Sequence, residues 1–117
     1  MRHKRGNKKL GKPTDQRIAM IRSLVRSLFI YKKIKTTDKR ALAAKRYAEK
    51  IITLAIKGDL SSIRRAIQLL PDKKVITVLK EFVKQIKSTQ GGYLRIVKVG
   101  EPRLGDNSPV SVLSFVD

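Results

Sequence analysis

The sequence contains no cysteine among its 117 residues, so disulfide bonds and thiolate metal sites are excluded. This absence fits a reducing compartment. No apolar run approaches the roughly 20 residues that a membrane-spanning helix needs. The basic amino-terminal end is not followed by the uninterrupted apolar segment and small-residue cleavage site of a secretory signal. We therefore expect a cytoplasmic protein.

Acidic residues are also scarce. The chain has 9 Asp and Glu against 28 Lys and Arg, which gives a formal net charge of +19. A compact domain with this charge repels itself, and a polyanionic partner relieves the repulsion. Nucleic acid is the commonest such partner, and an anionic membrane is the second candidate. A charged surface that serves only solubility is less favoured, because solubility seldom needs so large an imbalance.

The residues of catalytic and metal sites are few and isolated. His3 is the only histidine, so it cannot build a metal site or a catalytic triad alone. The serines have no partner base, and the glycines lack the spacing of a phosphate-binding loop. Several acids look structural, either as helix caps or in a turn: Asp15, Asp38, Asp59, Asp72 and Asp106. The sequence therefore predicts neither an enzyme nor a bound cofactor or metal.

Residues 1–12, which we call the basic tail, hold six Lys or Arg, no acid and almost no apolar side chains. Such a segment cannot build a core, so we expect it to be disordered in the free protein and ordered against a polyanion. The length of the chain predicts one domain, which we place at residues 13–117.

The first predicted helix begins at Pro13 and Thr14, with Thr14 as the cap. An apolar stripe at helical spacing follows from Ile18 to Phe29. The arginines fall off this stripe, which predicts a basic face whose residues are dispensable for folding. That face either binds a partner or is only solvated. Its members are Arg17, Arg22 and Arg26.

Periodicity and turn residues predict the other elements. The predicted order is a strand over 31–37, helices over 38–57, 59–70 and 72–86, a turn over 88–92, and strands over 93–99 and 110–116 around a loop. The second helix carries an apolar stripe rich in alanine, and the small side chains allow close approach of a neighbour. Its members are Ala41, Ala44, Ala48, Ile51, Ile52 and Ala55. The order α-β-α-α-α-β-β predicts an α+β fold with two layers, in which the helices pack on a small mixed sheet.

Charge alone does not separate RNA from DNA, but two features favour RNA. A flexible basic tail suits irregular RNA. Tyr93 and Arg95 should project to one face of their strand, where Tyr93 could stack on a base and Arg95 could reach a phosphate. An equally good interpretation is that Tyr93 closes the edge of the sheet. No helix-turn-helix or zinc-finger pattern is present.

Several short motifs are spread along nearly the whole chain. They are Met1-Arg2-His3 with Gly6 and Leu10-Gly11, Ile34-Lys35-Thr36-Thr37, Leu54-Ala55, Gly91-Gly92-Tyr93 with Arg95-Ile96, and Arg103, Gly105-Asp106-Asn107, Pro109 and Val116-Asp117. In their order and at matching spacing, these motifs resemble the seventeenth-protein family of the bacterial large ribosomal subunit. The resemblance implies a structural protein that binds large-subunit ribosomal RNA, with other ribosomal proteins of that subunit alongside.

The residues and the resemblance together predict the contacts with RNA. They lie in the basic tail, on the first helix, on the first strand and near the end of the chain. The candidates are Arg2, His3, Lys4, Arg5, Lys8, Lys9, Lys12, Arg17, Arg22, Arg26, Lys33, Lys35, Tyr93, Arg95 and Arg103. The alternative is a basic, nucleoid-like DNA-binding protein, and a membrane-active basic protein is a second alternative. Neither accounts for the carboxy-terminal motifs.

Overall fold

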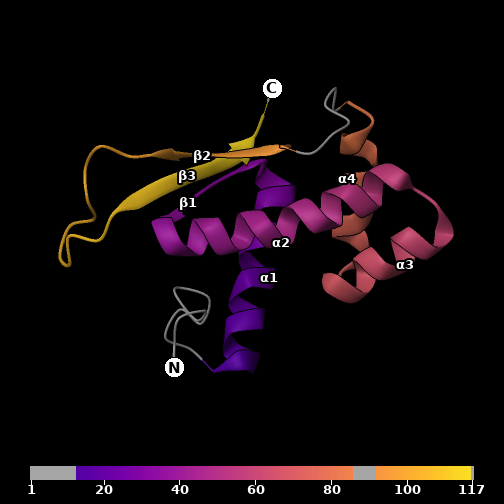
Figure 1. Ribbon diagram of the computed structural model, residues 1–117, viewed down its shortest axis with the longest axis horizontal. Helices are drawn as coiled ribbons and strands as arrows, with labels where there is room; N and C mark the ends of the chain where they lie inside the picture. Colours follow the sequence, from indigo (N-terminus) through magenta and orange to yellow (C-terminus); the bar gives the residue numbers. More distant parts are fainter. Residues whose placement is uncertain (1–12, 86–91, 117) are drawn as a thin grey trace, which may run out of the picture.

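The computed structural model describes residues 13–85 and 92–116 (Figure 1). Four helices and three strands follow one another in the predicted order, so the predicted α+β class is confirmed. The elements are α1 (Thr14–Tyr31), β1 (Lys33–Thr37), α2 (Asp38–Lys57), α3 (Leu60–Leu69), α4 (Lys73–Val83), β2 (Leu94–Lys98) and β3 (Val110–Phe115). The basic tail and most of the turn predicted at 88–92 lie outside the described residues.

The helix ends show which capping predictions are right. The side chain of Asp59 accepts a hydrogen bond from the Ser62 amide at 2.9 Å, and Asp72 accepts one from the Val75 amide at 3.3 Å. Both carboxylates therefore cap as predicted, at α3 and α4. The predicted caps at Thr14, Asp15 and Asp38 are wrong, because these residues lie inside α1 and α2, whose N-cap residues are Pro13 and Thr37.

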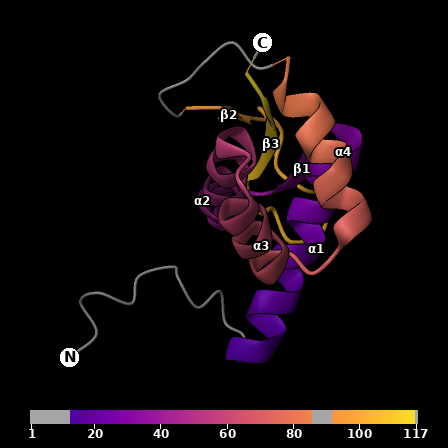
Figure 2. The ribbon, with the colours of Figure 1, turned by 90° about the vertical axis from the view of Figure 1, so that its right-hand side faces the viewer.

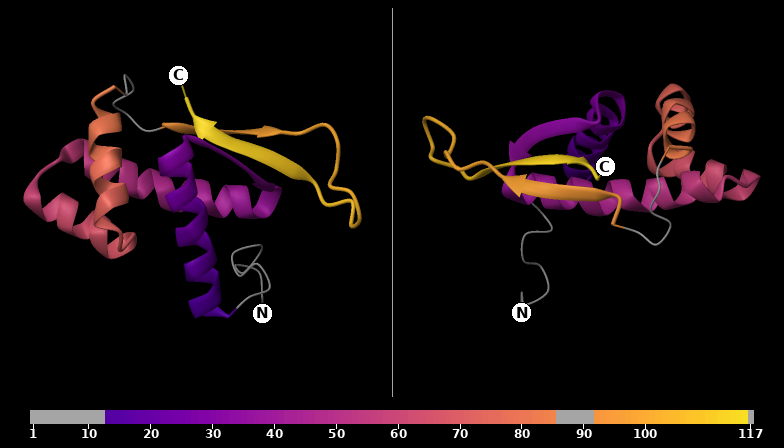
Figure 3. Two further views of the ribbon diagram at one scale, coloured as in Figure 1. Left: turned by 180° about the vertical axis from the view of Figure 1, so that it is seen from behind. Right: turned by 90° about the horizontal axis from the view of Figure 1, so that it is seen from above.

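The sheet has the strand order β1-β3-β2, and both pairings are antiparallel. The predicted mixed sheet is therefore wrong in this detail. β1 and β2 run in the same direction, but β3 lies between them, so no parallel pair forms (Figure 3). The last strand of the chain thus occupies the centre of the sheet and joins the amino-terminal strand to the carboxy-terminal hairpin.

α2 is the centre of the fold. One side of it packs against α1, α3, α4 and all three strands. Its buried residues coincide with the predicted stripe: Ala41, Ala44, Ala48, Ile51, Ile52 and Ala55. The small alanines let the neighbouring elements approach closely. The helices lie on one side of the sheet and leave its other face uncovered (Figure 1).

The core continues along the second half of α1. Val25, Leu28 and Phe29 are buried, whereas Ile21 and Leu24 are only partly buried. The amino-terminal part of α1 extends beyond the layer formed by α2, so its apolar residues have fewer neighbours (Figure 1). None of the helices described here is long and apolar enough to cross a bilayer.

Three phenylalanines join α1, α4 and β3. The ring centroids of Phe29 and Phe115 are 6.4 Å apart, and those of Phe82 and Phe115 are 4.7 Å apart in an edge-to-face arrangement. The Lys32 ammonium lies 4.4 Å from the centroid of the Phe82 ring and donates a hydrogen bond to the Phe29 carbonyl at 2.6 Å. Burial lowers the pKa of Lys32. This cluster closes the junction between the helices and the sheet.

Candidate nucleic-acid interface

The uncovered face of the sheet gathers cations from two separate parts of the sequence. Side chains alternate along a strand, so residues paired across strands share one face. β3 pairs Ser114 with both Lys33 and Arg95, and it pairs Val112 with both Lys35 and Val97. We call this surface the outer sheet face; its residues are Lys33, Lys35, Thr37, Arg95, Val97, Val99, Val110, Val112 and Ser114.

The cations flank an apolar centre. Lys33, Lys35 and Arg95 are exposed, and they lie on the two edge strands. Between and beside them, Val97 is 52% exposed and Val112 is half-buried. No ion pair within the described parts of the chain involves these three cations, since the pairs found there join other residues. The outer sheet face is therefore a positively charged surface that the rest of the described chain does not neutralise.

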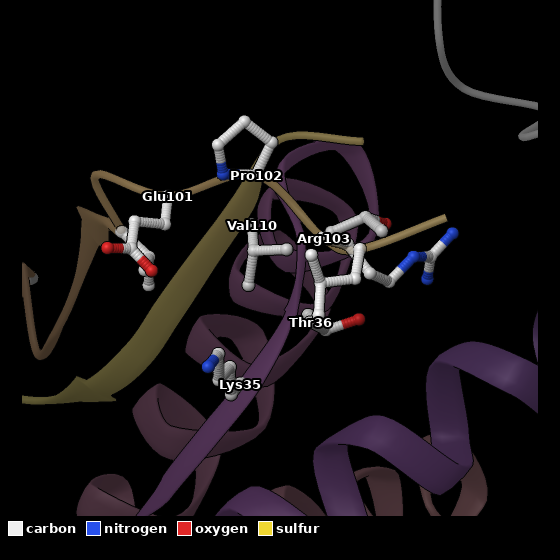
Figure 4. Close-up of a pocket in the computed structure, with 9 residues that line it drawn as sticks. Lys35, Thr36, Glu101, Pro102, Arg103 and Val110 are labelled. Atoms are coloured by element: carbon white, nitrogen blue, oxygen red, sulfur yellow. The ribbon is translucent and has the colours of Figure 1, made fainter. Parts of the chain in front are cut away.

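A pocket of about 540 Å³ continues this face toward the loop between β2 and β3. Thr36 and Val110 lie near its middle, with Glu101 and Arg103 on opposite sides of the view in Figure 4. Glu101 brings a negative charge to the pocket wall, which disfavours a phosphate inside it. The open strand surface beside the pocket, rather than the pocket itself, is thus the better anion site.

Arg103 is held within its loop. Its Nε donates to Asp106 Oδ1 at 3.0 Å, and its Nη2 donates to Asp106 Oδ2. These hydrogen bonds, with one from the Ser108 amide, lower the pKa of Asp106, and the carboxylate raises the pKa of Arg103. Asp106 therefore has the turn role predicted for it. Arg103 is still half-exposed and remains close to the outer sheet face.

The prediction that Tyr93 and Arg95 project together is wrong. Tyr93 is only 4% exposed and belongs to the core, whereas Arg95 is exposed. The strand begins at Leu94, so the alternation of strand side chains does not extend to Tyr93. The Tyr93 carbonyl accepts a hydrogen bond from the Val116 amide at 2.8 Å, which fixes the end of the sheet. Of the two interpretations, closing the sheet edge is the one the structure supports.

Two arginines of α1 are engaged inside the fold. Arg22 donates to the carbonyls of Leu69 at 3.0 Å and Gln68 at 3.3 Å. These carbonyls belong to the last turn of α3, where no later amide of the helix can pair with them. The guanidinium thus satisfies the carbonyl end of α3, where a cation is also favoured by the helix dipole. Tyr47 donates its hydroxyl proton to the same Leu69 carbonyl.

Arg26 joins α1 to the start of α4 through an ion pair with Asp72, with Nε 3.1 Å from Oδ2. The same carboxylate caps α4 through its other oxygen. Arg17, in contrast, makes only a contact with Thr14 of its own helix at 3.5 Å. The expectation that all three arginines are dispensable for folding is therefore wrong for Arg22 and Arg26.

Replacing Arg22 by alanine is expected to lower the free energy of unfolding by about 1–3 kcal/mol, because hydrogen bonds to a charged group are lost and carbonyls of α3 lose a partner. Arg17→Ala on the same helix is the control, and we expect it to change stability by less than about 0.5 kcal/mol. Urea denaturation measures both. Equal stabilities of the two variants would show that Arg22 does not hold α3.

No role was expected for the cations of α2. Lys39, Arg46, Lys50 and Lys57 are exposed and lie on the side of α2 opposite its buried stripe. Their spacing was visible in the sequence, because it follows the same helical period as the alanines. The candidates from Arg2 to Lys12 lie outside the described residues. Within the described ranges, no cluster of acids or histidine could hold a metal ion.

Comparisons with known proteins identify the family of the chain. The family described as "Ribosomal protein L17" matches residues 20–116. The chain is 44% identical to the large ribosomal subunit protein bL17 of Geobacter sulfurreducens, over 100% of this chain and 67% of that protein. It is 41% identical to bL17 of a Hydrogenobaculum species over 100% of both, and 49% identical to bL17 of Finegoldia magna over 94% of this chain and 84% of that protein. The chain therefore belongs to the ribosomal protein L17 family.

Proposed function

We propose that this chain is a structural constituent of the large ribosomal subunit and binds large-subunit ribosomal RNA through its outer sheet face and its basic tail. Its family consists of ribosomal proteins, not enzymes, and the relatives are named as proteins of the large subunit. In the assembled particle the chain acts in the cytoplasm, beside neighbouring ribosomal proteins. RNA is favoured over DNA by this family membership.

One observation carries the RNA contact. Lys33, Lys35 and Arg95 come from two distant segments of the sequence and meet on the face of the sheet that the described helices leave open. Lysine and arginine on such a surface neutralise phosphates, and each neutralised phosphate releases counterions into solution. Because Tyr93 is buried, the face offers no aromatic ring, so the proposed contacts are to the sugar–phosphate backbone rather than to stacked bases.

The other candidates add to this surface. Arg103 lies beside the outer sheet face, and its half-exposed guanidinium can extend the contact while it keeps its pair with Asp106. Arg17 has no long-range partner among the described residues, so its side chain is available to bind RNA. Arg22 and Arg26 bond to other elements of the fold, so only the parts of their side chains that remain exposed can contact RNA.

Replacement of Lys33, Lys35 and Arg95 together by glutamine tests the proposal. We expect the plot of log affinity for large-subunit ribosomal RNA against log salt to flatten by about 2–3 units, at about 0.7–0.9 units for each lost phosphate contact. The control variant changes Arg64, Lys74 and Lys80 to glutamine. These are also one arginine and two lysines, all exposed, and they lie on α3 and α4. Both variants should keep the wild-type melting temperature.

The control separates a specific surface from total charge. If the two variants lose affinity equally, the outer sheet face has no special role. A DNA duplex serves as the competitor in the same titrations. If the wild-type chain binds the duplex as tightly as it binds the ribosomal RNA at moderate salt, the nucleoid-like alternative is correct instead.

A further inference from the structure

A single line of cations runs along α2, on the side that no other described element covers. We call Lys39, Arg46, Lys50 and Lys57 the α2 row. Their spacings of seven, four and seven residues place them within about 40° of one another around the helix axis. At about 1.5 Å per residue, the row extends over about 27 Å. It therefore spans nearly the whole of α2, which has 20 residues.

The row faces away from the protein. The buried residues of α2 lie on the opposite side, against α1, α3, α4 and the sheet. Figure 2 shows α2 at one side of the molecule, with α1 and α4 at the other. All four cations are exposed. The row thus forms a positively charged edge on the helix that packs against every other element of the fold.

The described residues leave these charges without partners. The ion pairs within the described ranges join Arg26 to Asp72, Lys84 to Glu81 and Arg103 to Asp106. Of the two acids in α2, Asp38 accepts a hydrogen bond from the Ser111 hydroxyl, on the side toward the sheet. The other, Glu49, lies about 80° away from the line of the row.

A second, shorter line of lysines runs along α4, and it is partly neutralised by an acid. It holds Lys73 and Lys80 of α4 and Lys84, the residue just after the helix, and Lys84 is paired with Glu81 at 3.5 Å. The first and last of these lysines are 11 positions apart in the sequence, so the line is also little more than half as long as the α2 row. The α2 row is therefore longer than this line, and the described residues do not neutralise it.

From this arrangement we propose that the α2 row lies along the sugar–phosphate backbone of a double-helical segment of RNA. The proposal rests on the proposed function and adds to it a second surface and a class of RNA structure. Three of the four residues are lysines, which act as point charges toward phosphates without selecting a base. A regularly spaced line of such charges on a well-packed helix suits the regular backbone of a duplex, which proteins recognise by its shape.

The chemistry of the row argues against unpaired RNA. Proteins that hold single strands present aromatic rings on which the bases stack. No aromatic residue lies in the α2 row. The nearest one in α2, Tyr47, is half-buried, and its hydroxyl is bonded to the Leu69 carbonyl of α3. Thr53, on the same side of the helix, donates its hydroxyl proton to the Glu49 carbonyl and so offers no donor to a base edge.

The test replaces Lys39, Arg46 and Lys50 of the full chain by glutamine. Lys57 is kept because its charge acts on Asp59, the cap of α3. The probes are a fully paired RNA duplex of about 16 base pairs, the span of a double-stranded RNA-binding domain, and an unpaired uridine homopolymer with the same number of phosphates. Affinity is measured against salt for each probe. The control is again Arg64, Lys74 and Lys80 changed to glutamine, which removes the same three charges from α3 and α4.

The expected result is a slope for the duplex that flattens by about 2–3 units in the row variant, with little change in the control variant. The slope for the uridine homopolymer should change much less. Equal losses on the two probes, or equal losses in the row and control variants, would overturn the proposal. Melting temperatures of both variants should match the wild type, because the changed residues are exposed.

The same set of proteins separates this inference from the function on which it rests. If the wild-type chain binds large-subunit ribosomal RNA and the row variant binds it with an unchanged slope, the inference fails and the proposed function stands. If the wild-type chain shows no preference for that RNA over a DNA duplex, the proposed function fails.

Discussion

Replacement of Phe29 by alanine is expected to lower the free energy of unfolding by about 3–5 kcal/mol. Phe29 is completely buried in the second half of α1, and its ring lies beside that of Phe115 in β3. Phe115 in turn contacts Phe82 of α4. Loss of the ring would therefore leave a cavity where two helices and the central strand meet, in a domain whose total stability is on the order of 5–15 kcal/mol.

The neighbouring residue provides the control for this prediction. Ile30 is 47% exposed on the same helix, so Ile30→Ala should cost about 0.5 kcal/mol or little more. Denaturant unfolding gives both values. Phe29→Leu keeps most of the volume and should fall between them, which covers the case in which the alanine variant does not fold. A Phe29→Ala protein as stable as Ile30→Ala would show that the aromatic cluster is not central to the core.

Deletion of residues 1–12 is expected to have the largest effect on RNA binding. The segment carries six Lys or Arg. If each neutralises one phosphate, the slope of log affinity against log salt should flatten by about 4–5 units. The remaining chain keeps every described element, so its melting temperature should change little. The measurement is a salt titration of both proteins against large-subunit ribosomal RNA.

A second variant shows whether charge is the cause. It keeps the full length and replaces the six basic residues of the tail by glutamine. This protein should lose as much slope as the deletion does. An unchanged slope in both variants would mean that the basic tail is not bound and that the described domain holds the RNA alone.

The sequence predicted the order of the elements because each boundary carries a local signal. Asp59 and Asp72 cap the helices that begin directly after them. Gly58 adopts the positive φ of 72° that ends α2. The predicted apolar stripe of α2 contains the same residues as the buried side of the helix. These features depend on neighbours within about one helical turn, so the sequence displays them directly.

The errors about the arginines of α1 and about the strand order concern interactions between distant segments. The carbonyl that Arg22 bonds at the end of α3 and the carboxylate that Arg26 bonds at the start of α4 lie more than 40 residues away in the sequence. No local pattern distinguishes such arginines from an exposed basic face. The position of β3 between β1 and β2 likewise depends on pairing between distant segments. Because β3 pairs with both strands, Lys33, Lys35 and Arg95 lie on one surface.

Family membership and charge support the proposed function, and the fold indicates which surfaces could carry the proposed contacts. The net charge predicts a polyanionic partner, but it does not indicate which of the 28 basic residues contact that partner. Two arginines of α1 are bonded to other parts of the fold, whereas the cations of the outer sheet face and of the α2 row have no ion-pair partner among the described residues. These two surfaces are therefore the better candidates for contact with the partner. The two surfaces can be tested separately, since their residues lie on different elements and distant effects tend to add.

Fractionation of a cell lysate on a sucrose gradient tests the central claim most directly. The chain should sediment with large ribosomal subunits at moderate salt and should leave those fractions when the RNA is digested with ribonuclease. A chain that stays at the top of the gradient, or that sediments with nucleoid DNA and is released by deoxyribonuclease, would contradict the account.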